Sequence, residues 1–155
     1  MDRMDVRILQ LLQHNSAISN VELAEKVGLS ASPCLRRVKA LEEQGVIAGY
    51  RAHLEAKRLG LDLMALIHIS MDRHTPDRFE EFESRVRDCP EVLECYLITG
   101  QSADYVVKVL VQDMTAYQAF LLGTLTRIDG VSGVHSSFVM RKVVDRTALP
   151  LTMQS

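Results

Sequence analysis

The chain has 155 residues, of which 47% are hydrophobic and 25% charged, as in an average globular protein. This length fits one ordinary domain or two small ones and argues against the large core of a sizeable enzyme. Hydrophobic runs fall short of the roughly 20 residues that a membrane span needs, and the N-terminal residues lack the pattern of a secretory signal. We therefore expect a cytoplasmic protein with no membrane partner.

The charge is unevenly distributed. A net charge of -2 and an isoelectric point near 6.2 are unusual for a nucleic-acid-binding protein. However, residues 1–54 carry a net charge of +1, and the remaining chain carries -3. Residues 30–41 contain three basic side chains and no acidic one, which concentrates positive potential on one short element.

Two amphipathic helices are predicted first. Hydrophobic residues from Asp5 to Leu12 recur on one helical face. Ser19 and, three residues later, Glu22 form the capping-box pattern of a second helix. This helix should end at Gly28, because a left-handed C-cap is easily adopted only by glycine.

A third helix is predicted after a turn of about three residues. Ser32 precedes Pro33, and proline suits the first turn of a helix because its missing N–H would be unpaired there. This helix should end before Gly45. Two helices joined by a tight glycine-containing turn, with the small Ala24 at their contact, are typical of a helix-turn-helix, whose second helix enters the major groove of DNA.

The candidate DNA contacts lie on this third helix and just before it. They are Ser30, Ala31, Ser32, Pro33, Arg36, Arg37 and Lys39. We expect Arg36 or Arg37 to read a base, because arginine makes bidentate contacts with guanine, and we expect Lys39 and the hydroxyl groups to bind phosphates. The pattern alone is also compatible with a three-helix packing unit that has a solvated basic face.

The run from Leu23 to Glu42, followed by Gly45-Val46-Ile47 and Gly49-Tyr50, closely resembles the leucine-responsive regulatory protein/AsnC (Lrp/AsnC) family. The resemblance extends over the rest of the chain. It implies a bacterial or archaeal transcription factor that binds double-stranded DNA of the nucleoid. It also implies homodimers that assemble into tetramers or octamers and often respond to an amino acid.

An extended connector follows the three helices. The segment from Val46 to Leu54 is rich in strand-forming residues, and residues 55–60 are polar and end in glycine. We therefore predict a helix-turn-helix domain over residues 1–45, a hinge strand and linker over 46–60, and a second domain over 61–155. The resemblance implies that the hinge strand pairs with its twin in a dimer.

The second domain repeats one pattern twice. Strand-like and helix-like segments alternate in the order βαββαβ over residues 63–71, 76–89, 92–99, 105–111, 114–125 and 134–143. This order predicts a ferredoxin-like antiparallel sheet with both helices on one face. Together with the N-terminal helix-turn-helix domain, which we expect to be winged-helix-like, it predicts an α+β protein. Since residues 65–69 and 105–109 are apolar on both faces, another subunit should bury the open face.

A polar turn in this domain is the candidate effector site. Glycine and small residues could present backbone N–H groups to a carboxylate, and Asp104 could accept a hydrogen bond from an ammonium group, so an amino-acid zwitterion would fit. The alternative is a plain hairpin in which Gly100 supplies a positive φ and Asp104 bonds its own turn.

The resemblance implies an effector pocket between dimers, built around a glycine-x-x-aspartate-tyrosine turn. This chain has one more residue between Gly100 and Asp104, which predicts a reshaped pocket or a different ligand. The candidate effector residues are Thr99, Gly100, Gln101, Ser102, Asp104 and Tyr105, together with Ser136 and Ser137 of the last strand.

No arrangement of residues points to an enzyme. The histidines are scattered singly, and no glycine-rich phosphate loop follows a strand, so we expect no catalytic site, metal or cofactor. The predicted function is a sequence-specific transcriptional regulator modulated by a small amino acid bound between dimers. The alternative is a small-molecule-binding or DNA-architectural assembly protein without an amino-acid response.

Overall fold

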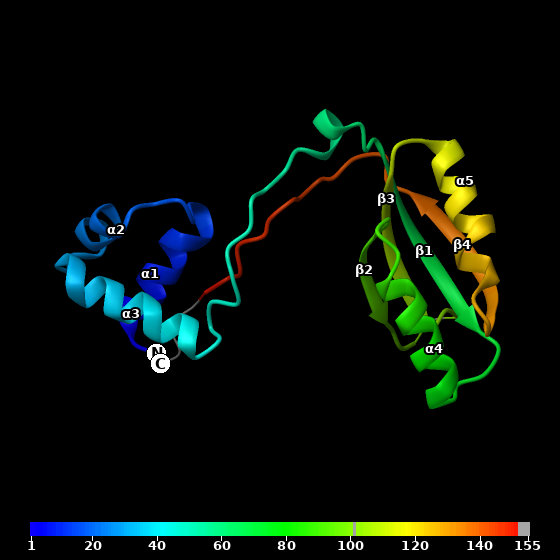
Figure 1. The fold of residues 1–155 in the computed structure, drawn as a ribbon, viewed down its shortest axis with the longest axis horizontal. Coiled ribbons are helices and arrows are strands. Elements are labelled where there is room, and N and C mark those ends of the chain that lie inside the picture. Colours follow the sequence, from blue (N-terminus) through cyan, green and yellow to red (C-terminus); the bar gives the residue numbers. More distant parts are fainter. Residues whose placement is uncertain (101, 152–155) are drawn as a thin grey trace. The chain divides into compact units, whose positions relative to one another are not determined.

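The computed structural model describes residues 1–100 and 102–151, and the chain divides into two compact units (Figure 1). The first unit comprises Met1–His53 together with the segment from Val143 onward, and the second comprises Leu54–Lys142. The sequence had assigned residues 61–155 to one domain. The structure differs because the C-terminal segment packs with the N-terminal helices.

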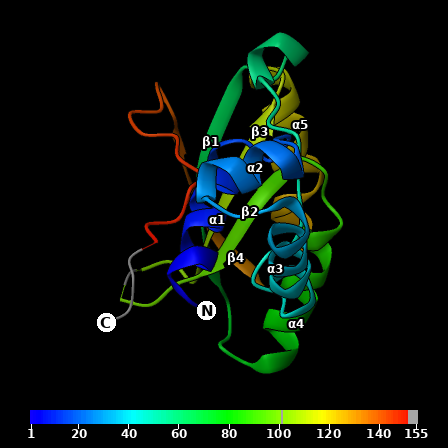
Figure 2. The same cartoon turned by 90° about the vertical axis from the view of Figure 1, so that its left-hand side faces the viewer.

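The first unit contains the three predicted helices, shown from two directions in Figures 1 and 2. They are α1 (Arg3–His14), α2 (Asn20–Val27) and α3 (Ala31–Glu43). Ser19 and Glu22 form the expected capping box of α2, and Gly28 ends it with a φ of 75°. Helix α1 starts earlier than predicted, because Asp2 caps it and forms a second capping box with Asp5.

Helix α3 begins at Ala31, with Ser30 as its N-cap, so the predicted start at Ser32 and Pro33 was wrong. Proline gave an ambiguous signal because none of the first few N–H groups of a helix has an intrahelical partner, so proline is tolerated at several positions there. The three helices enclose a core of buried side chains, which are Ile8, Leu9, Leu23, Ala24, Val27, Cys34 and Leu41.

The predicted hinge strand is not formed by residues 46–54 of the described chain. A strand requires a partner for its backbone hydrogen bonds, and the resemblance placed that partner in a second subunit. One side chain links this segment to α3, since the Tyr50 hydroxyl donates to Glu42 at 2.8 Å. Burial and this carboxylate raise the pKa of Tyr50 to about 12.

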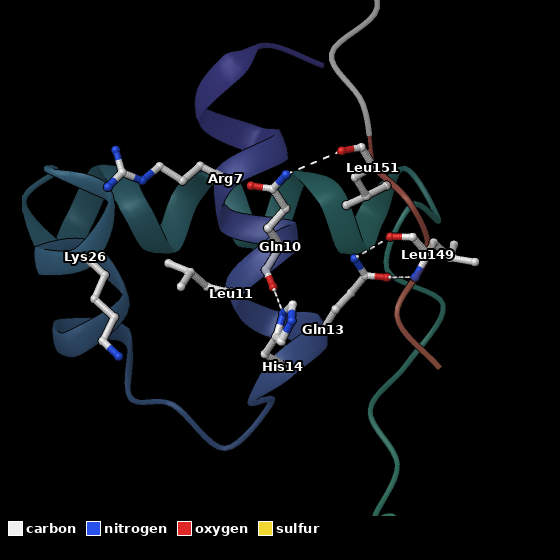
Figure 3. A pocket seen from close by; sticks show the side chains of 8 residues that line it. All are labelled: Arg7, Gln10, Leu11, Gln13, His14, Lys26, Leu149 and Leu151. Carbon is white, nitrogen blue, oxygen red and sulfur yellow. Dashed lines mark hydrogen bonds between the residues drawn. The ribbon is translucent and has the colours of Figure 1, made fainter. Parts of the chain in front are cut away.

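The C-terminal segment lies along α1 (Figure 3). The Gln13 side-chain amide donates to the Leu149 carbonyl at 3.3 Å and accepts from the Leu149 N–H at 2.6 Å. Gln10 donates to the Leu151 carbonyl at 3.4 Å, and Leu151 packs against the helical core. Because Leu149 precedes Pro150, its backbone disfavours a helical conformation.

The second unit has the predicted βαββαβ order. Its elements are β1 (Leu63–Met71), α4 (Pro76–Arg87), β2 (Val92–Leu97), β3 (Tyr105–Val111), α5 (Met114–Gly123) and β4 (Val131–Phe138). Two short 3-10 helices lie at Ala56–Leu59 and Leu125–Arg127. The strands are antiparallel in the order β2-β3-β1-β4, which confirms the ferredoxin-like sheet.

One face of this sheet is covered by the helices. Ala65, Ile67 and Ile69 of β1 share a buried cluster with Phe82 of α4 and Phe120 of α5. Since alternate residues of a strand point to opposite faces, Leu66 and His68 lie on the other face, where they are only partly buried. The described helices include none that is long and apolar enough to span a membrane.

Candidate nucleic-acid interface and effector site

The outward face of α3 carries three of the predicted DNA contacts. Cys34 is completely buried, so its side of α3 faces the core. Ser32, Arg36 and Lys39 are exposed, and their spacing of four and three residues places them on one face of the helix. Helix α3 therefore presents a hydroxyl, a guanidinium and an ammonium group along the side that faces away from the core.

The N-terminus of α3 is held in place by α2. The Asn20 side-chain amide donates to the Ala31 carbonyl at 2.8 Å and so connects the first turns of the two helices. Ser30 caps α3 without a side-chain hydrogen bond to the helix, and Ser30 and Ala31 are both exposed, whereas Pro33 is partly buried. Sequence reasoning missed Asn20, because its partner, the Ala31 carbonyl, belongs to another helix.

Arg37 points toward the start of α1, whereas Arg36 is exposed. Its guanidinium binds Asp2 at 2.7 Å and Asp5 at 2.8 Å, and its side chain is 34% exposed. These contacts connect α3 to the N-terminal capping box of α1. Hydrogen bonds from the Asp5 backbone N–H and then from Arg37 lower the pKa of Asp2 to about 2. In this structure the Arg37 guanidinium is therefore paired with carboxylates of the helical unit itself.

The candidate effector turn connects β2 to β3. Gly100 has a φ of 81°, as the hairpin interpretation expected, and the Ile98 N–H donates to the Asp104 carbonyl at 2.8 Å across the turn. Thr99 and Ser102 are exposed. Gln101 lies outside the described residues.

Asp104 bonds to β1 and its following loop, where the hairpin interpretation had expected a bond within its own turn. Its Oδ2 accepts the Met71 N–H at 2.7 Å, and its Oδ1 lies 2.8 Å from Nε2 of His74. Its own N–H donates to the Ile69 carbonyl at 2.7 Å. The carboxylate is thus held at one end of the sheet, with 20% of its side chain exposed.

Some of the other candidate effector residues point away from the Asp104 carboxylate. Tyr105 is 1% exposed and donates to Glu83 of α4 at 2.8 Å. Burial, followed by this carboxylate, raises its pKa. Ser136 hydrogen-bonds the Tyr117 hydroxyl of α5. Ser137 pairs with Leu66 and therefore points to the uncovered face, because neighbouring residues of a strand alternate.

A cavity of about 390 Å³ opens beside the turn, lined by His68, Ser70, Ser102, Ala103, Gly133, Val134 and His135. His68 and His135 face each other across β1 and β4, with ring centroids 6.3 Å apart. Nδ1 of His68 is buried and lacks a hydrogen-bond partner within the described chain. Two imidazoles, hydroxyl groups and turn backbone can together bind a small polar ligand. Sequence reasoning missed this pair because the two histidines are far apart in the chain.

Comparison with known proteins finds two family models that match this chain. Residues 1–48 match the family model described as winged helix-turn-helix DNA-binding, and residues 64–149 match the Lrp/AsnC ligand binding domain. The fold and site therefore define a ligand-modulated, DNA-binding transcriptional regulator.

Similar proteins cover nearly the whole chain. The Bkd operon transcriptional regulator of Pseudomonas aeruginosa is 44% identical over 97% of this chain and 98% of its own length. The leucine-responsive regulatory protein of Haemophilus influenzae is 44% identical over 97% of this chain and 90% of its own. This protein belongs to the Lrp/AsnC family, as the resemblance had implied.

Solved structures agree with this assignment. A transcriptional regulator of Neisseria meningitidis in complex with L-Met superimposes with a TM-score of 0.93 at 43% identity, over 97% of this chain and 96% of the other. AsnC of E. coli superimposes with a TM-score of 0.87 at 26% identity, over 96% and 97% of the two chains.

Proposed function

We propose that α3 reads DNA through Arg36, and that Ser30, Ser32 and Lys39 bind the phosphate backbone. The observation that carries this proposal is the exposed face of α3, on which Ser32, Arg36 and Lys39 lie opposite the buried Cys34. An exposed guanidinium on a recognition helix can donate two hydrogen bonds to one guanine. Arg37 is assigned to the helical unit itself because Asp2 and Asp5 already bind it.

The proposed regulator acts as a dimer or larger assembly. Leu66 and Val106 lie on the uncovered face of the sheet, opposite the buried residues of the same strands. Water contact with such a face is costly, so a second copy of the chain is its proposed partner. In such a dimer two α3 helices can contact successive major grooves of a roughly palindromic site.

The proposed effector is a small amino acid. The structurally similar regulator of Neisseria meningitidis was solved with L-Met, and several relatives are named leucine-responsive. In this chain Asp104 offers a carboxylate for an ammonium group, and a cavity lined by Ser102 and Ala103 of the same turn also offers His68, His135 and Ser70. The proposed activity is regulatory, at the nucleoid, without a catalytic step.

A thermal-shift screen of the full chain against the twenty amino acids tests the effector. A ligand that binds only the folded state raises the melting temperature. We expect one or a few amino acids to do so, and Asp104→Ala to lose the effect. If none does so at millimolar concentration, the protein is instead a DNA-binding assembly protein without an amino-acid response.

A DNA-binding measurement on the same sample tests the interface. Affinity for a site selected from random duplex DNA should fall steeply with salt, because each phosphate contact adds about 0.9 to the logarithmic salt slope. An affinity independent of salt would contradict the assignment of Ser30, Ser32 and Lys39 to phosphates.

A further inference from the structure

The two carboxylate oxygens of Asp104 have different partners. Oδ2 accepts the Met71 backbone N–H at 2.7 Å, so this oxygen is part of the connection between the effector turn and β1. Oδ1 lies 2.8 Å from Nε2 of His74. Oδ1 has a second lone pair, but an oxygen that already accepts from the imidazole is a weaker acceptor for a second donor, so an ammonium group gains most at Oδ1 when the imidazole moves away.

His74 is free to make this movement. Its side chain is 70% exposed, and it lies in the loop between β1 and α4, beside the ring of Phe79 with centroids 6.1 Å apart. A contact whose histidine is this open to water is weak. The imidazole can therefore leave Asp104 at small cost, while the bond from Met71 keeps the carboxylate in place.

We propose that His74 occupies the ammonium subsite of the effector pocket while no effector is bound. Its Nε2–H donates to Oδ1 of Asp104 in place of the ligand, and the ammonium group of an amino acid displaces it. This inference rests on the proposed amino-acid response and deepens it, because it names the residue that sets effector affinity at this subsite.

The same arrangement gives the pocket a chemical preference. A ligand with an ammonium group replaces the lost bond at Asp104 with one of its own. A carboxylic acid of the same shape but without the amino group does not contact Oδ1 and leaves His74 in place. The competition therefore concerns only ligands that carry an ammonium group.

Calorimetric titration of the full chain with L-leucine and L-methionine tests the proposal. Because the free protein spends part of its time with His74 on Asp104, its apparent affinity is reduced by that fraction. His74→Ala should therefore bind the amino acid more tightly, by roughly two- to sixfold for a contact that is open to water on the histidine side. Arg73→Ala is the matched control, since it removes a neighbouring exposed cation that does not contact Asp104, and its affinity should equal that of the wild type.

A leucine analogue without an amino group and a variant of Asp104 test whether the effect of His74 depends on the ammonium group and on Asp104. 4-Methylpentanoate, which is leucine without its amino group, should bind the wild type and His74→Ala equally. In an Asp104→Ala background, which removes Oδ1, His74→Ala should change nothing, because the two side chains act on one interaction. In the wild type, L-leucine should shift the His74 imidazole resonances to the positions that they have in Asp104→Ala.

The outcomes separate this inference from the proposed function. If the wild type binds an amino acid and His74→Ala binds it equally or more weakly, the displacement is wrong and the amino-acid response stands. If only His74→Ala binds, the histidine blocks the subsite as proposed. If neither binds any of the twenty amino acids, both proposals are overturned.

Discussion

Arg36 and Arg37 are adjacent in the sequence and have different partners. Successive residues of an α-helix are rotated by about 100°, so the buried Cys34 directs Arg36 outward and Arg37 toward α1. Asp2 and Asp5 hold Arg37, whereas Arg36 is exposed. The sequence could not choose between these arginines, because the acidic partners of Arg37 are about thirty positions away in the chain.

Alanine substitutions of the two arginines should separate the recognition of DNA bases from the stability of the helical unit. Arg36→Ala should cost ~1–3 kcal/mol of DNA-binding free energy and relax base preference at one position, with little change in melting temperature. Arg37→Ala should lower the melting temperature of the helical unit. Fluorescence anisotropy and thermal unfolding measure the two effects, and a reversed pattern would exchange the assigned roles.

The low pKa of Asp2 predicts how the helical unit responds to acid. The pKa of Asp2 is about 2 in the folded chain, below its ordinary value of 3.8. A lowered pKa stabilises the folded state above the unfolded value, and this contribution is lost as the pH falls through the folded value. The wild type should therefore lose stability between about pH 5 and pH 2.

Asp2→Asn isolates this contribution, because asparagine caps a helix about as well as aspartate and has no titrating proton. Its melting temperature should be lower at pH 7, and the difference from the wild type should shrink toward pH 2. A difference that stays constant over this range would mean that the charge of Asp2 contributes nothing to stability.

At the scale of elements, the chain's capping and alternation patterns were good predictors where they acted locally. Ser19, Glu22 and Gly28 correctly delimit α2 because all three act on neighbouring backbone groups. The last strand was predicted over residues 134–143, whereas β4 is Val131–Phe138. Beyond Phe138 the chain still contains strand-forming residues, but Met140 and Val143 are exposed, because strand propensity needs a neighbouring strand to pair with.

The contact of the C-terminal segment with α1 depends on Gln13. Gln13→Ala removes two hydrogen bonds to Leu149 and should destabilise the helical unit by ~1–2 kcal/mol, since each such bond is worth about 1 kcal/mol. Gln10→Ala should cost less, because its one bond is 3.4 Å long. Gln118→Ala, on an exposed position of α5, is the control.

Hydrogen exchange of the backbone amides of α1 and of Leu149 measures this effect. Faster exchange at both places in Gln13→Ala is the expected result. Unchanged protection of Leu149 would show that the packing of Leu151 and its bond from Gln10 are enough to hold the segment on α1.

At the scale of the whole molecule, the fold class was predictable and the composition of the proposed effector site was not. The repeated βαββαβ order is visible along the chain. In contrast, the His68 and His135 pair and the His74 contact with Asp104 depend on how β1, β3 and β4 align. Tyr105 was assigned to the candidate site from the turn motif and Ser136 from its place on the last strand, yet each points to the helix-covered face.

Assembly should depend on the uncovered face of the sheet. Leu66→Glu introduces a charge into the centre of this face, where burial against another subunit would leave the charge unpaired. We expect the molecular mass measured by light scattering to fall toward that of a monomer, with retained secondary structure. Gln118→Glu adds the same charge on an exposed helix and should leave the mass unchanged. Equal masses for both variants would exclude this face as the interface.

The position of residues 149–151 on α1 also has a consequence for protein synthesis. The ribosome completes α1, α2 and α3 early, but the segment that Gln10 and Gln13 bind emerges only after the whole second unit. A nascent or prematurely terminated chain therefore carries a DNA-binding unit that lacks its final packing segment. Such fragments should be more susceptible to proteolysis than the full chain, which limits their competition for operator sites.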